Sequence, residues 1–311
     1  MKLVDFDILI DETFVNICTD PTLTPIDKSY LLSVVNGFED GKWRYDIFRN
    51  FVFNNIAEAG LSARERAALA GKNYELLVAA AQKLRIEKEI NDQSGGEIGE
   101  IMLYGIMKHH FNALPVVPKI FYKQNAKDYV KGADSVHITL TEGGDFELWL
   151  GEAKFYNSIG DARFTIPINS VEELLRTKKL RDENSLITNL HDLDDLLKNE
   201  ELSNRIKAAL CKGVSIDDIK RILHVPILLL HECDITMVSR EYDQAYKEAI
   251  IEHHKERANS YFQKQMAKLK QNVTKLDEIH FHLILFPVAS KEYIVKDFMD
   301  RAKIFQNDGN N

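Results

Sequence analysis

Cysteine, proline and net positive charge are all scarce in this sequence. The 311 residues include three cysteines and seven prolines, and the formal charge is -8. The cysteines (Cys18, Cys211 and Cys233) are widely spaced and form no CxxC pair. This pattern argues against a disulfide framework and a structural zinc site, and it favours a reducing cytoplasm. With more acids than bases, no global positive field attracts nucleic acid, so any such binding must be local or assisted.

Long apolar runs and several common catalytic motifs are missing too. The most apolar segments, around 225–230 and 281–289, are too short to span a bilayer. Residues 1–12 carry acids and lack the apolar stretch of a signal peptide. No GxxxxGK[ST] or G-x-S-x-G is present, so ATP binding and acyl transfer have no support. We expect a cytoplasmic protein with no membrane role.

The patterns that are present predict an α/β protein with two regions. Residues 1–90 contain one early strand and a helical pattern from 26 to 84, which predicts a mainly helical N-terminal region and a candidate partner-binding unit. The turn-prone run NDQSGG marks a boundary. In the second region, 91–311, the pattern predicts a helix at 96–111 and then strands at 116–123, 132–140 and 146–155. A helix at 169–181 should follow, with Asn169 or Ser170 as its N-cap. The remaining elements are a strand at 225–233, helical structure at 240–276 and a strand at 278–288. These elements favour a mixed central sheet flanked by helices.

Chemistry is concentrated on the third of these strands. Glu152 and Lys154 are two residues apart in LWLGEAKFY, so they share one face of the strand, while Ala153 points to the other. Unpaired charge is expensive in such an apolar strand, so a partner is expected. A hairpin turn at EGGD, residues 142–145, would bring Asp134 to both of them. Two close carboxylates suit Mg²⁺, and Lys154 can orient or deprotonate a water molecule.

Asp134 followed by Glu152-Ala153-Lys154, after an acid-bearing helix and before a helix and a strand, resembles the αβββαβ restriction-endonuclease-like core of the PD-(D/E)xK nuclease superfamily. The resemblance implies that Asp134, Glu152 and the carbonyl of Ala153 bind the metal, while Lys154 positions the attacking water. Members often add a glutamate from the first helix, where both Glu97 and Glu100 qualify; Glu100 is preferred because it stands nearer the strands. The sequence departs from the pattern in having no proline before Asp134.

A more particular resemblance is to HamA, the family of nuclease subunits of the Hachiman anti-phage defence system. It depends on GEIGE, GADSVHI, LWLGEAKFY, VEELLRTKKL, VPILLLHE and HFHLILFPV, and it covers about 90–290. It implies an Mg²⁺- or Mn²⁺-dependent DNA nuclease with an ATP-dependent helicase subunit, HamB, as its partner. DNA cleavage would be restrained until infection or DNA damage is sensed, and the helicase would supply the DNA-binding surface that this acidic chain lacks.

Other interpretations stay open. An ExK triplet alone often forms a surface ion pair, so the chain could instead be a catalytically inactive nuclease-fold subunit that binds a protein, or a nuclease acting on RNA. The lysines at 119, 123, 127 and 131 fit either phosphate contact or a solvated strand edge. His280 and His282 share a strand face, where packing is favoured over metal binding. The adjacent pairs His109-His110 and His253-His254 are assigned no role.

Overall fold

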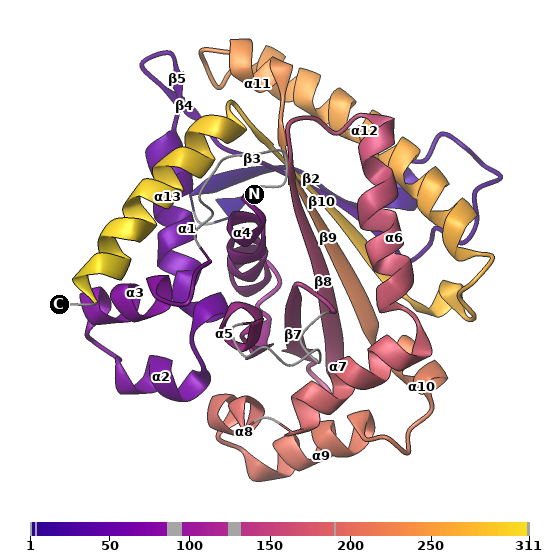
Figure 1. The fold of residues 1–311 in the computed structure, drawn as a ribbon. Coiled ribbons are helices and arrows are strands. Elements are labelled where there is room, and N and C mark those ends of the chain that lie inside the picture. The colour runs from indigo at the N-terminus through magenta and orange to yellow at the C-terminus, as the bar shows by residue number, and fades with distance from the viewer. Residues whose placement is uncertain (1, 4, 86–94, 124–131, 190, 310–311) are drawn as a thin grey trace.

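The main architectural feature is a mixed sheet that crosses the whole protein. The computed structural model describes residues 2–3, 5–85, 95–123, 132–189 and 191–309 (Figure 1). Within these residues, eight strands pair in the order β1-β2-β3-β10-β9-β8-β7-β6. Their bounds are β1 Lys2–Leu3, β2 Phe6–Thr13, β3 Ser29–Val35, β6 Leu114–Val117, β7 Ser135–Leu140, β8 Phe146–Tyr156, β9 Leu223–Glu232 and β10 His280–Val288. A separate small ribbon pairs β4 (Phe38–Glu39) with β5 (Lys42–Trp43).

The centre of the sheet is parallel and its edges are antiparallel. β3, β10, β9 and β8 run in the same direction, whereas β7 and β6 on one side and β2 and β1 on the other alternate in direction. β9 and β10 read LHVPILLLHE and HFHLILFPV, and nearly every residue in them is buried. Continuous apolar strands of this kind form where helices cover both faces of a sheet. The predicted mixed central sheet flanked by helices is confirmed.

Helices cover the two faces of this sheet with separate cores. α1 (Tyr45–Gly60), α3 (Asn73–Ala81), α4 (Gly96–His109) and α13 (Lys291–Asp308) pack on one face, with α2 (Ala63–Ala68) beside them. α6 (Thr165–Leu174), α7 (Thr177–Asn189), α9 (Glu200–Leu210) and α12 (Gln244–Leu269) pack on the other. The remaining short helices are α5 (Lys119–Lys123), α8 (Asp192–Leu197), α10 (Ile216–Lys220) and α11 (Asp234–Val238). Of the helices described, none combines the length and the apolar character that crossing a membrane requires.

The alternation along β8 sorts its side chains between these cores. Leu148 and Leu150 belong to the core under α6 and α12, while Trp149 and Ala153 belong to the core under α1, α4 and α13. Because side chains alternate along a strand, Glu152 and Lys154 point to the α6 and α12 side. The charged residues are therefore directed away from the core that α4 covers.

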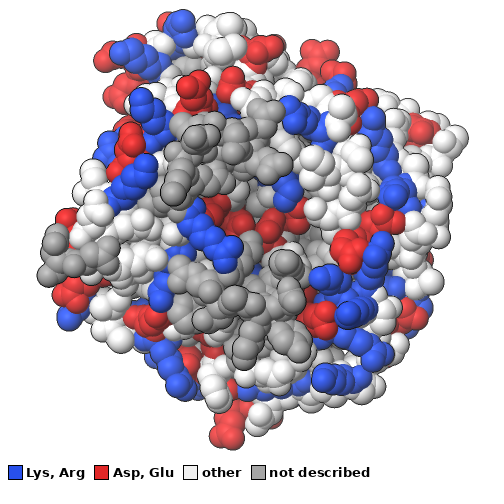
Figure 2. Space-filling model, viewed as in Figure 1, with Lys and Arg blue, Asp and Glu red and all other residues white. Residues whose placement is uncertain are grey.

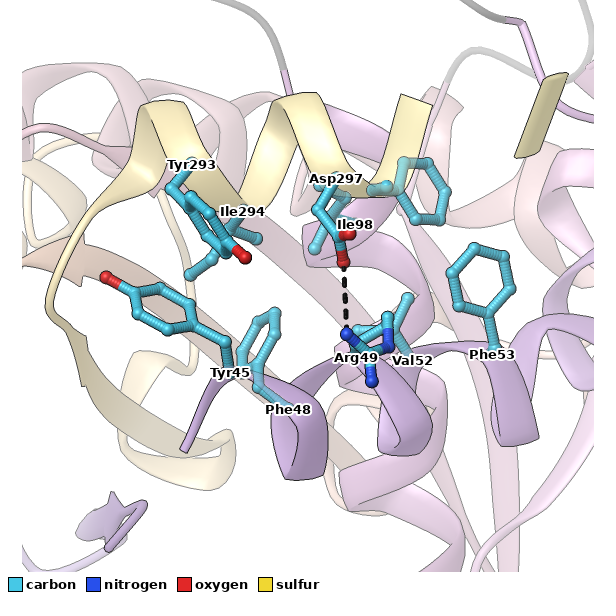
Figure 3. A pocket seen from close by; sticks show the side chains of 10 residues that line it. Tyr45, Phe48, Arg49, Val52, Phe53, Ile98, Tyr293, Ile294 and Asp297 are labelled. Carbon is cyan, nitrogen blue, oxygen red and sulfur yellow. Dashed lines mark ion pairs between the residues drawn. The ribbon is translucent and has the colours of Figure 1, made fainter. Parts of the chain in front are cut away.

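On the α4 side, α1 and α13 close the outer layer (Figure 3). Aromatic rings of Tyr45 and Tyr293 meet with centroids 4.4 Å apart, and Arg49 of α1 forms an ion pair of 3.6 Å with Asp297 of α13. The cavity between the two helices is only about 10 Å³. A cavity of this size is close to the minimum that a single water needs, so α1 and α13 pack closely along this seam.

The helical interpretation of the N-terminal region is wrong for residues 26–44. Strand β3 and the β4 and β5 ribbon occupy much of that segment, and β3 pairs in parallel with β10. The run SYLLSVV has β-strand length and composition, but it is short beside the Ala-rich helices that follow it. The predicted boundary at residue 90 lies outside the described residues. Segments on its two sides share the sheet and one core.

Two further elements differ from the prediction. The strand expected at 116–123 ends at Val117, and α5 begins directly after Pro118. The helix expected at 169–181 is two helices: α6 begins at Thr165, and α7 begins at Thr177. Pro167 lies in the first turn of α6, where a missing N–H costs nothing, so the helix begins before Asn169 and Ser170 and neither residue caps it. The strands at β7, β8, β9 and β10 and the helix α4 are confirmed.

Candidate active site

The β7 and β8 hairpin brings Asp134 to the ExK triplet. Ser135 pairs with Gly151 in the antiparallel register, and the backbone N–H of Asp134 donates to the Gly151 carbonyl at 2.7 Å. The Asp134 carboxylate in turn accepts a hydrogen bond from the N–H of Ala153 at 3.1 Å. The side chain of Asp134 is thus fixed against the end of β8, as hairpin pairing predicted.

Gly151 is needed where the strands and α4 come together. A Cβ atom there would overlap the hydroxyl oxygen of Ser135 and lie 2.7 Å from a methyl carbon of Leu103 on α4. Both separations are far below van der Waals contact, so only glycine fits without displacement. The glycine directly before Glu152 therefore sets how closely β7 and α4 approach this part of β8.

Lys154 supplies the compensating charge that the buried Glu152 and the partly buried Asp134 require. Its ammonium nitrogen is 2.5 Å from Glu152 Oε1 and 3.6 Å from Asp134 Oδ2. It also donates to the carbonyl oxygen of Ala153 at 3.1 Å. Glu152 is only 5% exposed. A buried carboxylate needs such a partner, because leaving it unpaired costs several kcal/mol.

The carboxyl of Glu152 has an unusual acidity. Burial, reinforced by the nearby Asp134 carboxylate, raises the pKa of Glu152 to about 7, although Lys154 and a hydrogen bond from Ser170 oppose the shift. The carboxylates of Asp134 and Glu152 raise the pKa of Lys154 above its usual value despite burial. Lys154 is therefore an ammonium ion at neutral pH. In that form it can orient a water molecule or a phosphate oxygen, but it cannot remove a proton from the water.

The oxygen atoms around Lys154 fit a divalent cation. Carboxylate oxygens of Asp134 and Glu152 and the carbonyl oxygen of Ala153 all converge on its ammonium nitrogen. Hard oxygen donors of this kind are the ligands that Mg²⁺ and Mn²⁺ prefer. Figure 2 shows acidic side chains gathered in a hollow over β8, beside α4. The donor set, the charge and the hollow surface are all compatible with the predicted metal site.

The two helix glutamates have different surroundings. Glu97, at the start of α4, accepts two hydrogen bonds from the backbone N–H of Arg85, at 2.9 and 3.1 Å. Glu100 lies deeper and is 8% exposed, on the part of α4 where a Cβ at Gly99 would be 3.5 Å from that of Ala153. Because Ala153 points to the α4 side and Glu152 to the opposite side, this contact does not by itself favour Glu100. Its role as a metal ligand stays a prediction.

A buried ion pair that the sequence did not indicate holds the segment before Asp134. The ammonium of Lys119 lies 2.9 and 2.7 Å from the two carboxylate oxygens of Glu183 on α7, and both side chains are almost fully buried. Glu183 Oε1 also accepts from the backbone N–H of Ala133 at 3.0 Å. A Cβ at Gly132 would overlap that oxygen, so glycine is required for the approach. No spacing in the sequence links residues 119 and 183.

This ion pair changes the interpretation of the lysines at 119, 123, 127 and 131. Both interpretations are wrong for Lys119, since its buried ammonium neither reaches phosphate nor protects a solvated edge. The side chain of Lys123 and residues Lys127 and Lys131 lie outside the described part of the chain.

Three histidines near the amino ends of β9 and β10 form a packed stack with Trp149 of β8. The ring of His224 lies 4.2 Å from that of His280 and 4.2 Å from that of Trp149, and its Nδ1 is 2.9 Å from Nε2 of His282. Burial lowers the pKa of His224 to about 3, so the stack is uncharged near neutral pH. Packing of His280 and His282 is confirmed.

The raised pKa of Glu152 predicts how stability changes with pH. Because its folded pKa of about 7 exceeds the ordinary value of 4.5, the folded state binds the extra proton between these two values. Stability should therefore fall as pH rises from about 5 to about 8, by on the order of 2 kcal/mol from this group. Urea unfolding with a chelator present, at both pH values, should show this loss in the wild type and a smaller one in Glu152→Gln. Equal losses would contradict the raised pKa.

Comparison with known proteins provides the family. The family model HamA matches residues 11–302, nearly the whole chain. A search of curated proteins found no match. The matched span begins at the end of β2 and continues into α13, and so contains Asp134, Glu152, Lys154 and Glu100. The chain therefore belongs to the HamA family and is a component of Hachiman anti-phage defence.

Proposed function

We propose that this chain is a metal-dependent DNA nuclease and the effector subunit of a helicase-coupled anti-phage complex. The observation that carries the proposal is the convergence of Asp134, the buried Glu152 and the Ala153 carbonyl on the partly buried ammonium of Lys154. An ordinary surface ion pair needs neither two acids nor burial. Perturbed, buried titratable groups in a hollow are typical of catalytic sites.

In the proposed reaction, Asp134, Glu152, the Ala153 carbonyl and Glu100 would hold Mg²⁺ or Mn²⁺. When bound, the ion supplies Lewis-acid stabilisation of the charge that develops on the scissile phosphate. Binding of the ion requires Glu152 to lose its proton, so affinity for the ion should weaken below a pH of about 7. Burial on the α6 and α12 side restricts water around the site, which strengthens each of these interactions.

Lys154 has a distinct task in this scheme. Its ammonium is held by both carboxylates and has three N–H donors on a flexible stem. A cation bound to the acids would compete for these oxygens and leave Lys154 donors available for the attacking water and a phosphate oxygen. Attack of the water oxygen on phosphorus would form a new P–O bond and break the bond to the leaving oxygen, while the water loses a proton to solvent and the leaving oxygen takes one up.

A partner that delivers DNA fits the charge of the chain. With a formal charge of -8, the protein lacks the electrostatic attraction that draws most nucleases to a phosphate backbone. We propose that an ATP-dependent helicase subunit provides this surface and controls access to the site.

The direct test compares the chain alone with the chain plus its helicase partner. Supercoiled plasmid, single-stranded DNA and RNA are each incubated with Mg²⁺, with Mn²⁺ or with a chelator, with and without ATP. We expect DNA cleavage that requires the divalent ion and increases with the partner. Cleavage of RNA alone would assign the activity to RNA.

The competing function is a catalytically inactive nuclease-fold subunit that binds a protein. It is favoured by the ion pairs of Lys154, which already neutralise the acids without a metal. Calorimetric titration with Mg²⁺ and Mn²⁺ separates the two functions. If neither ion binds and no substrate is cleaved with the partner present, the binding role is correct and the nuclease proposal is wrong.

A further inference from the structure

A second group of metal-ligating side chains lies outside the candidate active site, at the carboxyl end of β9. His231 is near the end of that strand, where it pairs with Tyr156 of β8, Cys233 precedes α11, and His253 is on α12. One ligand atom from each of the three lies within 4.8 Å of the others. Three elements thus place two imidazoles and a thiol around one point.

The surroundings of His231 leave one ring nitrogen available to a metal. The side chain is fully buried, and its Nδ1 is 3.2 Å from the carbonyl oxygen of Leu229. A carbonyl only accepts, so the Nδ1–H donates to it and the lone pair is on Nε2. Nε2 is buried, and no described residue gives it a hydrogen bond. Metal-bound histidines commonly donate their second ring N–H to a backbone carbonyl in this way.

Burial keeps the two imidazoles neutral, which suits a metal, whereas it raises the pKa of the Cys233 thiol. It lowers the pKa of His231 to about 3 and lowers the pKa of His253, so both rings are neutral at physiological pH. The thiol of Cys233 is free of any disulfide and 5% exposed. A bound cation would take the place of its proton. An unsatisfied buried acceptor such as His231 Nε2 is unfavourable, and coordination would remove that penalty.

One side of the group opens to a cavity. This cavity has a volume of about 340 Å³ and is lined by residues 157–160 after β8, by the Cys233 segment and by His253, Glu256 and Arg257 of α12. The loop after β8 is tied to α12 because Asp161 pairs with Arg257 at 3.0 Å and with Lys264 at 3.2 Å. A fourth coordination position facing this space can take water or an anionic group.

We propose that His231, Cys233 and His253 bind a Zn²⁺ ion whose fourth position faces this cavity. Two imidazoles and a thiolate are ligands for a borderline divalent ion such as Zn²⁺, whereas Mg²⁺ prefers oxygen donors. The site is therefore chemically different from the acidic one at Asp134 and Glu152. The cysteine pattern argued against a structural zinc site, and the proposed site departs from that expectation because two of its three ligands are histidines. By joining β9 to α12, the ion would also stabilise the face of the sheet on which Glu152 and Lys154 lie.

Cobalt substitution tests the proposal on the full chain, first stripped of metal with a chelator. Co²⁺ is titrated alone, and the sulfur-to-cobalt charge-transfer band and the visible tetrahedral bands are recorded. One equivalent should produce both, and Zn²⁺ should abolish them by displacement. Cys233→Ser should lose the charge-transfer band, and His253→Gln should weaken Co²⁺ binding at least about tenfold. Circular dichroism verifies that each variant is folded.

Control variants show whether the cobalt spectrum comes from this site or from another thiol or acid in the chain. Cys211→Ser and Cys18→Ser remove the other two thiols and should leave the spectrum unchanged. Glu152→Gln should also leave it unchanged, since the acidic site has no sulfur ligand. Absence of the band in the wild type, or a band that survives Cys233→Ser, would overturn the proposal. If Cys233→Ser does not fold, the wild-type thiols can be alkylated with and without Zn²⁺ instead. Zn²⁺ should protect Cys233 from alkylation and leave Cys211 reactive, and equal alkylation of Cys233 in both conditions would overturn the proposal.

Discussion

Glu152→Ala is expected to lower the rate of metal-dependent DNA cleavage by at least about 10³-fold while the protein stays folded. The substitution removes a metal-binding oxygen and the strongest partner of Lys154, which lies 2.5 Å away. It also removes a carboxyl whose pKa is raised by burial, so the metal-free fold should lose little stability. Cleavage is followed by the loss of supercoiled plasmid in the presence of Mg²⁺ and the helicase partner.

One further variant tests the charge of Lys154, and another serves as a control. Lys154→Met should be as inactive as Glu152→Ala, because an uncharged side chain cannot offset phosphate charge or orient water. Glu142→Gln, in the exposed turn of the same hairpin, serves as the matched control and should cleave at the wild-type rate. Wild-type activity in Glu152→Ala or in Lys154→Met would remove the proposed active site from consideration, whatever the control shows.

The hairpin that carries the site was predictable because its signals are local. A spacing of two places Glu152 and Lys154 on one face of any strand, and EGGD is a turn sequence between two β-rich segments. Once the hairpin closes, the position of Asp134 follows from pairing alone. The buried strands β9 and β10 were equally visible, because each is a continuous apolar run bounded by polar residues.

What the sequence could not show depends on contacts between distant segments. The strand β3 pairs in parallel with β10, which lies about 250 residues later in the chain, as in the hydrogen bond between Tyr30 and His280. The helical pattern around it gave no indication of that partner. The same is true of the group at His231 and His253, whose ligands come from a strand and a helix. Periodicity describes which face of an element is buried and not what lies against it.

The pair of Lys119 and Glu183 is the strongest case of such a contact, and it leads to the second large prediction. Lys119→Met should reduce the free energy of unfolding by about 3–5 kcal/mol, because Glu183 would remain charged and buried without its partner. Glu183→Gln should do the same to Lys119. The exposed ion pair of Lys72 and Glu75 is the control, and Lys72→Met should change stability by no more than about 0.5 kcal/mol.

The double variant Lys119→Met with Glu183→Gln tests whether charge is the cause. Both side chains are then neutral, and the amide oxygen introduced by Glu183→Gln can still accept from the Ala133 N–H, which Glu183 holds at 3.0 Å. Most of the lost stability should return, since replacing both members of a buried pair is often close to neutral. Urea denaturation of the wild type, the two single variants and the double variant measures the coupling. Additive losses would mean that the two residues do not interact in solution, and that the segment before Asp134 is held by other contacts.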